Sequence, residues 1–386
     1  MKTSSNRRLF ACACLCLVTF GIVLTTLGAV LPSVMARFGI DKTSAGALLT
    51  LMTFGILTGA LASGPVVDRR GYKVILLGGT ALVIVGLEGV AFAPSLPWLR
   101  VAAFVTGFAG GAINSCSNAL VSDISGDERG RRLNLLAVFF GIGAMAVPFL
   151  LALLTERFSH PVLIASIGAV VAVPLAVMAT TDFPPSKHPA GFPIRDAGRL
   201  VQDPVMLLMG LMLFLQSGVE ITVGGWMSTF ATEELAMAER AALIVLSLYW
   251  TGMMVGRLAI GTVLGGISPF RILYLSLTIA LGGAAMLLVS KGAGAAAAGG
   301  FLLGLGCAGM FPTLLGFIGT RYAALSGTAI GAALATALCG GMLGPYVVGV
   351  VGEKFGMRVS FLIVPAALAA LGGLLVILSR SLRAHG

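Results

Sequence analysis

Long apolar runs alternate with short polar breaks along the whole chain. The runs lack the alternation of apolar and polar positions that is typical of barrel strands. A helix rises about 1.5 Å per residue, so it needs roughly 20 apolar residues to cross a hydrocarbon layer about 30 Å thick. The pattern predicts twelve membrane-spanning helices, at residues 9–32, 44–65, 74–94, 98–121, 133–154, 161–180, 205–230, 241–264, 270–290, 295–319, 327–350 and 358–379.

The longest polar interruption separates six predicted spans from six. We therefore expect an N-terminal six-helix half (1–180), a cytoplasmic linker (181–204) and a C-terminal six-helix half (205–386). The other loops are short, so neighbouring helices should pack antiparallel. The predicted fold is an all-α membrane protein, and two such halves around a site at the membrane midplane are found in many secondary transporters.

Composition agrees with an integral membrane protein. Of 386 residues, 58% are hydrophobic and 10% are charged, and the mean hydropathy is +1.02. The first apolar run is too long for the core of a cleaved signal peptide. The 53 glycines gather within the spans, where they allow helices to pack closely. Helices that pack statically and helices that slide during transport both need small residues, so the glycines do not distinguish the two cases.

The distribution of basic residues predicts the orientation. If the N-terminus is cytoplasmic, sixteen of the 25 Lys and Arg residues fall on the cytoplasmic side and eight on the other. Both termini are therefore expected inside, and the net charge of +10 requires no nucleic-acid partner. We expect a monomer in the lipid bilayer, and the short loops favour a bacterial cell inner membrane.

Candidate chemistry for an enzyme is sparse. The six cysteines include no C-x-x-C pair, and the three histidines, His160, His188 and His385, lie in or near predicted loops. We expect no catalytic residues, no metal site and no cofactor, and therefore no enzyme.

One polar stretch, Gly64-x-x-x-Asp68-Arg69-x-Gly71-x-Lys73, follows the second predicted span. We expect Gly64 and Gly71 to permit a tight reversal. A carboxylate such as Asp68 is stabilised if it approaches the N-terminus of another helix. A loop that only fixes topology, with a capped helix end, is the alternative.

This stretch resembles the signature loop of the major facilitator superfamily, and the chain resembles that family in length and layout. The resemblance implies a cytoplasmic latch in which Asp68 pairs with the start of the eleventh helix, near residues 326–328, and Arg69 reaches Asp123. The second half has Gly265 where the matching acid would stand. The latch is therefore expected to be one-sided, or to use Arg257 differently.

Segments in both halves resemble the fucose/galactose/glucose proton symporters and the related sodium-dependent glucose transporter-like proteins. They are residues 134–148, 218–226, 249–257, 311–313 and 340–345. The resemblance implies a sugar substrate and coupling to a proton or sodium ion. The fucose symporter is expected to carry acids in its first and fourth spans, and this chain has none there.

Three ionisable residues lie well inside predicted spans, where such groups are costly and tend to be functional. Glu88 falls on a peripheral helix, where snorkelling or a local ion pair would account for it. Glu220 falls near the middle of the seventh span and could exchange a proton, accept sugar hydroxyls or bond to a neighbouring helix. Arg257 could pair with Glu220, close the inner gate or be structural.

Other candidates for substrate binding are uncharged. Gln216 lies one turn before Glu220 and so shares its face. Trp226 follows Gly224 and Gly225, where the helix could bend, and is either a platform for a sugar ring or an anchor at the membrane boundary.

Four residues of the fourth span, Gly107, Gly111, Asn114 and Asn118, form one stripe. The two asparagines suit an uncharged polyol, although packing between helices is the rival interpretation. Asn134 either lines the site or faces the cytoplasmic surface. Tyr249 and Thr313 complete a mostly neutral lining.

The sequence thus predicts a sugar transporter that works by alternating access as a cation symporter, with Glu220 as its coupling group. An exporter of drugs or small metabolites from the same superfamily, coupled to protons, is the alternative. A membrane protein that transports nothing is a third possibility, which the latch loop and the polar stripes disfavour.

Overall fold

The computed structural model describes residues 2–184, 203–263, 266–322 and 325–384. Its helices are α1 (Lys2–Ala29), α2 (Leu31–Phe38), α3 (Lys42–Arg70), α4 (Tyr72–Ala91), α5 (Leu96–Ile124), η1 (Gly126–Glu128), α6 (Arg129–Leu154), α7 (His160–Ala179), α9 (Pro204–Glu233), α10 (Glu239–Thr262), α11 (Pro269–Val289), α12 (Ala293–Cys307), α13 (Met310–Arg321), α14 (Ser326–Phe355), α15 (Met357–Phe361) and α16 (Ile363–Ala384). Within the described ranges, twelve helical stretches are long and apolar enough to cross a membrane, as predicted.

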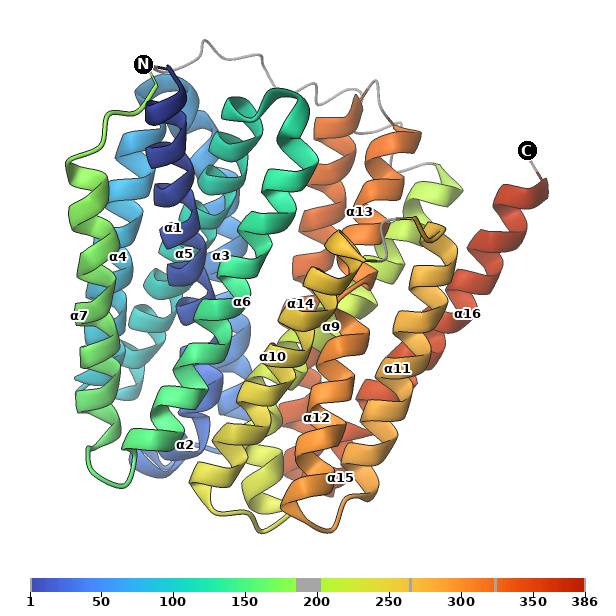
Figure 1. The fold of residues 1–386 in the computed structure, drawn as a ribbon. Helices are drawn as coiled ribbons and strands as arrows, with labels where there is room; N and C mark the ends of the chain where they lie inside the picture. Colours follow the sequence, from blue (N-terminus) through green and yellow to red (C-terminus); the bar gives the residue numbers. More distant parts are fainter. Residues whose placement is uncertain (1, 185–202, 264–265, 323–324, 385–386) are drawn as a thin grey trace.

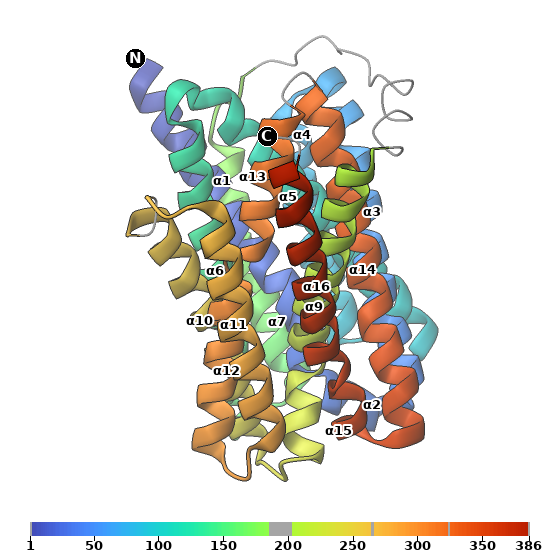
Figure 2. The same ribbon diagram turned by 90° about the vertical axis from the view of Figure 1, so that its right-hand side faces the viewer.

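The helices form two bundles side by side, α1 to α7 and α9 to α16 (Figure 1). In the first half α3 packs on α5 and α1 on α6, and in the second half α9 packs on α14 and α10 on α12. Figure 2 looks onto the second half, where α16 lies beside α9. Most of the predicted linker, residues 185–202, lies outside the described residues, so the domain boundaries stay predictions.

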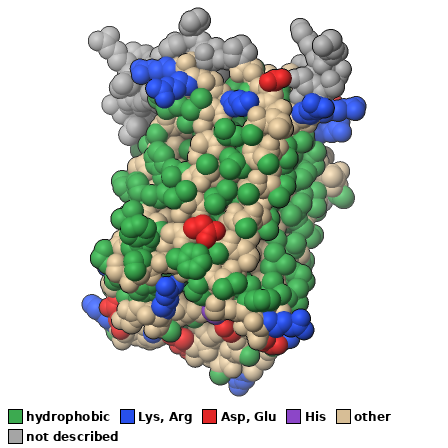
Figure 3. All heavy atoms as spheres, turned by 90° about the vertical axis from the view of Figure 1, so that its left-hand side faces the viewer, with side chains coloured by type: hydrophobic (Ala, Val, Ile, Leu, Met, Phe, Trp, Pro, Cys, Tyr) green, Lys and Arg blue, Asp and Glu red, His purple; other side chains and the backbone are tan. Residues whose placement is uncertain are grey.

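Both chain ends lie at one end of the bundle, which we call the terminal end, while α2 and α15 lie at the opposite end (Figure 1). The face over α4 and α7 shows a mostly apolar belt, with one acidic patch within it, between two charged rims (Figure 3). Basic side chains dominate the terminal rim, and both signs of charge are mixed at the opposite rim. That the terminal end faces the cytoplasm remains a prediction.

The second span is longer than predicted. α3 continues through Gly64 and Pro65 to Arg70, and the reversal occurs at Gly71, whose φ of +79° and ψ of 172° suit glycine. The Gly71 N–H closes the helix by donating to the Val67 carbonyl at 2.8 Å. The prediction that Gly64 helps to make the turn is therefore wrong, because one glycine at the helix end is sufficient.

The two halves meet through side chains at the opposite end. The side-chain contacts recorded there between halves are an ion pair of Lys42 with Glu233 (3.1 Å), a hydrogen bond between His160 and Glu239 (2.6 Å) and an ion pair of Glu156 with Arg240 (3.4 Å). The backbone N–H of Lys42 also donates to Glu353 at 2.9 Å. These contacts join α3 and α7 to α9, α10 and α14, so the structure is closed at the opposite end.

Backbones from the two halves also approach closely in that part of the bundle. Gly28 of α1 lies so near α9 that a Cβ atom at this position would be 2.3 Å from the Gly224 carbonyl oxygen. The Ser228 hydroxyl donates to the Gly28 carbonyl at 2.6 Å. Thr50 of α3 likewise donates to the Met342 carbonyl of α14 at 2.7 Å. Closure therefore depends on small residues as well as on charge.

Candidate functional site

Glu220 and Arg257 lie together near the middle of the bundle. Glu220 is near the centre of α9, and its Oε1 lies 3.8 Å from Nη2 of Arg257 on α10. Their side chains are only 12% and 17% exposed. The Arg257 guanidinium also lies over the Phe140 ring of α6, 5.3 Å from its centroid. The pairing considered from sequence is thus present within the second half, and the Phe140 contact joins it to the first half.

Gln216 joins this pair to a break in the tenth span. Its side chain is fully buried, and its Nε2 lies 3.5 Å from Glu220 Oε2 and donates to the Cys307 carbonyl at 3.2 Å. Cys307 is the last residue of α12, and α13 begins only at Met310. Carbonyl groups at a helix end lack a partner within the helix. Many transporters build their sites at such interrupted helices.

Four buried polar atoms in this region have no hydrogen-bond partner among the residues that the structure describes. They are Gln216 Oε1, Tyr249 Oη, Trp250 Nε1 and Arg257 Nε. An unsatisfied buried polar group costs about 1–3 kcal/mol. These atoms belong to the ion pair itself or to residues close to it, so this region is the candidate site. We call Gln216, Glu220, Tyr249, Trp250 and Arg257 the Glu220 site.

Aromatic rings form one wall of the Glu220 site. Trp250 lies edge-on to Tyr249, with ring centroids 5.1 Å apart, and to Phe140 at 5.9 Å. A Cβ atom at Gly224 would be 2.7 Å from the Trp250 ring, so a glycine on α9 allows this indole its position. The sequence alone does not distinguish Trp250 and Phe140 from other apolar residues of the spans. Two features could have pointed to them: Trp250 follows Tyr249, and Phe140 lies within the resembling segment 134–148.

Trp226 lies apart from these residues. It is fully buried, and its indole Nε1 donates to the Pro345 carbonyl of α14 at 2.9 Å. α9 continues through Gly224 and Gly225 without a break. These glycines permit the close approach of α1 and of neighbouring side chains instead. Neither role considered for Trp226 is tested by this contact, and its platform role stays a prediction.

The predicted polar stripe on α5 has two parts. Cβ atoms at Gly107 and Gly111 would collide with the carbonyls of Met52 and Ile56 on α3, so these glycines serve helix packing. Asn118 is exposed and donates to the side-chain oxygen of Asn114 at 3.1 Å. The two asparagines thus share a face, as predicted, while their role in binding stays a prediction.

Two other candidates lie on different helices. Asn134 is exposed near the start of α6, which fits the surface alternative. Thr313 is partly buried in the first turn of α13, beyond the break after Cys307. The structure records no side-chain hydrogen bond between either residue and the Glu220 site. Their substrate roles remain predictions.

The expected latch is only partly within the described residues. Asp123 accepts a hydrogen bond from the Tyr72 hydroxyl at 2.5 Å, and Asp68 lies in the last turn of α3. The side chains of residues 326–328 lie outside the described part. The pairings expected of Asp68 and Arg69 therefore stay predictions.

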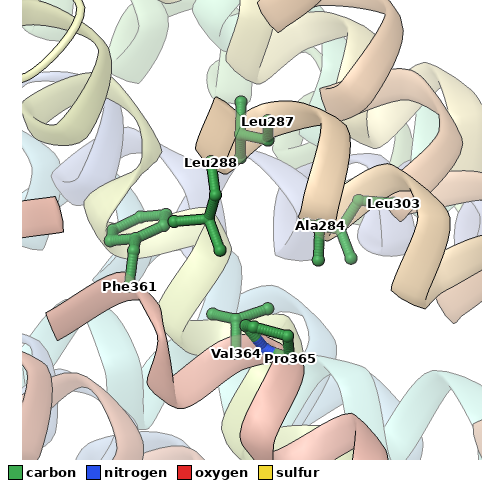
Figure 4. Close-up of a pocket in the computed structure, with 7 residues that line it drawn as sticks. All are labelled: Ala284, Leu287, Leu288, Leu303, Phe361, Val364 and Pro365. Atoms are coloured by element: carbon green, nitrogen blue, oxygen red, sulfur yellow. The ribbon is translucent and has the colours of Figure 1, made fainter. Parts of the chain in front are cut away.

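Two further features lie away from the site. Glu88 on α4 faces α7, since a Cβ atom at Gly168 would be 2.6 Å from Glu88 Oε1. A small pocket among α11, α12, α15 and α16 is lined by Leu287, Leu303, Phe361 and other apolar residues (Figure 4). It offers no polar side chain to a solute.

Comparison with known proteins gives one family. The model of the Major Facilitator Superfamily matches residues 13–333. Bypass of stop codon protein 6 of Saccharomyces cerevisiae is 25% identical over 279 residues, which are 65% of this chain and 56% of that protein. The chain thus spans little more than half of that relative.

Other similar proteins are matched along most of their length. The 3-(3-hydroxy-phenyl)propionate transporter of Escherichia coli is 28% identical over 361 residues, 90% of this chain and 88% of that protein. The crystal structure of a D-xylose-proton symporter superposes with a TM-score of 0.80 at 13% identity, over 96% of this chain and 97% of that one. At this identity the superposition shows the fold alone.

Proposed function

The chain belongs to the major facilitator superfamily and is a transporter of that fold, and on this premise we propose that it moves a hexose or a related sugar by alternating access. We further propose that it is a symporter coupled to a proton or a sodium ion. The substrate site would be the Glu220 site, whose residues come from the second half and which contacts Phe140 of the first half.

The observation that carries the proposal is a charge-balanced site rich in unsatisfied polar atoms. Glu220 compensates Arg257 at 3.8 Å, so the site has no net charge to offer a charged solute. Trp250 Nε1 and Arg257 Nε remain as donors, Gln216 Oε1 as an acceptor and the Tyr249 hydroxyl as either. A sugar presents hydroxyls that both donate and accept. Its C–H faces can also pack against the Trp250 ring.

Coupling would follow from the state of Glu220. A cation bound at this carboxylate weakens its pairing with Arg257 and frees both side chains for the substrate. Ion and sugar together must favour a conformational change that neither favours alone. The closed opposite end supplies one of the two conformations that this cycle requires.

A second candidate substrate is a hydroxylated aromatic carboxylate. The Escherichia coli relative is a 3-(3-hydroxy-phenyl)propionate transporter, and that compound is of this kind. When Glu220 binds a proton, Arg257 becomes free to pair with a carboxylate, and Phe140, Tyr249 and Trp250 can pack against its ring. With a neutral Glu220 the site carries the positive charge of Arg257, which suits a carboxylate. With an ionised Glu220 the site has no net charge, which suits a sugar.

Counterflow in proteoliposomes tests the two substrate classes directly. Vesicles with the purified protein are loaded with unlabelled solute, and the entry of labelled glucose, galactose, fucose or 3-hydroxybenzoate is followed. We expect exchange of a sugar and none of the benzoate. Exchange of the benzoate alone would replace the sugar proposal with the second candidate, and exchange of neither by folded protein would contradict both.

A further inference from the structure

A hollow of about 210 Å³ opens at the terminal end between α1 and α6, two helices that lie side by side in Figure 2. This is far more than the ~10–15 Å³ that admits one water. It is lined by Arg7 and Phe10 of α1, Glu128 of η1, and Arg131, Arg132 and Leu135 of α6. None of these residues belongs to the Glu220 site, and we call this place the basic hollow.

Among the side chains that the structure describes, three arginines and one acid line the basic hollow. Glu128 accepts from Nε and Nη2 of Arg132, both at 3.0 Å. Arg131 reaches the same carboxylate only at 3.5 Å and is 85% exposed. Arg7 has no recorded ion pair or hydrogen bond to any part of the chain that the structure describes. Two guanidinium groups thus remain available, and guanidinium binds phosphate oxygens in a bidentate manner.

The depth of the basic hollow places it at the membrane boundary. The first and fifth apolar runs predicted from the sequence begin at residues 9 and 133, so Arg7 and Arg131 each come two residues before their run. Phe10 and Leu135 follow one turn deeper, and Leu135 is 45% exposed. The two arginines, with the apolar Phe10 and Leu135 one turn deeper, match the order of phosphate and acyl chain in a phospholipid. A free phosphate would use only the upper part.

We propose that the basic hollow binds the phosphodiester group of an anionic phospholipid, with Arg7 and Arg131 on the phosphate and an acyl chain along Phe10 and Leu135. Basic pockets between membrane helices are suited to such head groups. Because the hollow involves α1 and α6, which pack on each other, a bound lipid also contacts both helices.

Lipid titration followed by native mass spectrometry tests the proposal. The full-length protein in a neutral detergent is titrated with phosphatidylglycerol or phosphatidylcholine. Arg7→Gln/Arg131→Gln is compared with Arg8→Gln/Arg70→Gln, which removes the same charge from exposed sites outside the hollow. We expect preference for phosphatidylglycerol, a loss of about 25-fold in affinity in the first variant at roughly fivefold per arginine, and little change in the second.

Three outcomes would overturn the proposal: no preference for phosphatidylglycerol, an equal loss in both variants, or displacement of the lipid by inorganic phosphate at comparable concentration. The last result would assign the hollow to a soluble phosphate. Melting temperatures in phosphatidylcholine micelles check the fold. If the double variant melts lower, Arg7→Gln alone carries the test, since this side chain has no recorded protein partner to lose.

Discussion

Substitution of Gly28 by alanine should open the opposite end without harming the fold. A Cβ atom at this position would lie 2.3 Å from the Gly224 carbonyl oxygen and 2.8 Å from the Gly225 Cα, across the boundary between halves. Ordinary contacts of this kind are 3.4–4 Å long, so α1 and α9 must separate by about 1 Å. Within α1 itself, alanine is the better helix former by about 1 kcal/mol.

The magnitude follows from the cost of overpacking. Forcing a methyl group into a packed contact costs about 1–3 kcal/mol. That cost falls only on the conformation in which the halves touch here, so the ratio of closed to open opposite ends should fall roughly 5- to 150-fold. The overall stability of the fold should fall by no more than the free-energy gap between the two conformations, because the open conformation avoids the contact.

Spin-label distances across the opposite end measure this ratio. Glu156→Cys and Arg240→Cys place labels on the two halves at positions whose side chains are 3.4 Å apart, with Cys339→Ser removing the exposed native thiol. Gly28→Ala should move the distance distribution to longer values. Gly64→Ala, with open space around its Cβ, should leave the distribution unchanged.

A second control separates opening from damage. Gly143→Ala would place a Cβ atom 2.0 Å from the Val18 carbonyl, within the first half. It should lower the melting temperature and leave the distance between the halves unchanged. An unaltered distribution in Gly28→Ala, or the same shift in Gly143→Ala, would refute the reasoning.

Three further changes test other parts of the account. Tyr249→Phe removes a buried hydroxyl that has no partner among the described residues, so it should weaken sugar exchange while the melting temperature holds or rises. Thr80→Val removes a similar hydroxyl elsewhere and should leave sugar exchange intact. Loss of exchange in both variants would count against the Glu220 site. Lys42→Met removes the pair with Glu233 and should favour opening by at most about fivefold in spin-label distances, since partly exposed pairs contribute about 0.2–1 kcal/mol. Gly71→Ala should cost about 1–3 kcal/mol in thermal unfolding because of its positive φ, and unchanged unfolding would show that the turn adapts.

Hydrophobic patterning was enough to predict the fold because lipid leaves the chain few alternatives. Each span must satisfy its own backbone as a helix and must match the thickness of the membrane. The same physics made Glu220 conspicuous, as a carboxylate in the middle of an apolar run. Span ends were harder to predict, since α3 crosses Gly64 and Pro65 as a helix and stops only where Gly71 adopts a positive φ.

The composition of the site depended on contacts between distant segments. Nothing in the local sequence shows that Arg257 lies 3.8 Å from Glu220, or that the tenth span breaks after Cys307 and leaves a carbonyl for Gln216. From the sequence, Trp250 cannot be told from any other buried aromatic residue. The structure adds that its indole N–H has no partner among the described residues. The contacts at the opposite end also join residues that are 79 to 311 positions apart in the sequence.

The most direct test of the central claim is accumulation of labelled sugar in proteoliposomes under an inward proton gradient, for wild type and Glu220→Gln. If glucose, galactose or fucose exchanges, we predict that wild type concentrates it and that the variant exchanges it passively without concentrating it. An inward sodium gradient replaces the proton gradient if the latter has no effect. Accumulation by Glu220→Gln equal to that of wild type would contradict the assignment of coupling to Glu220.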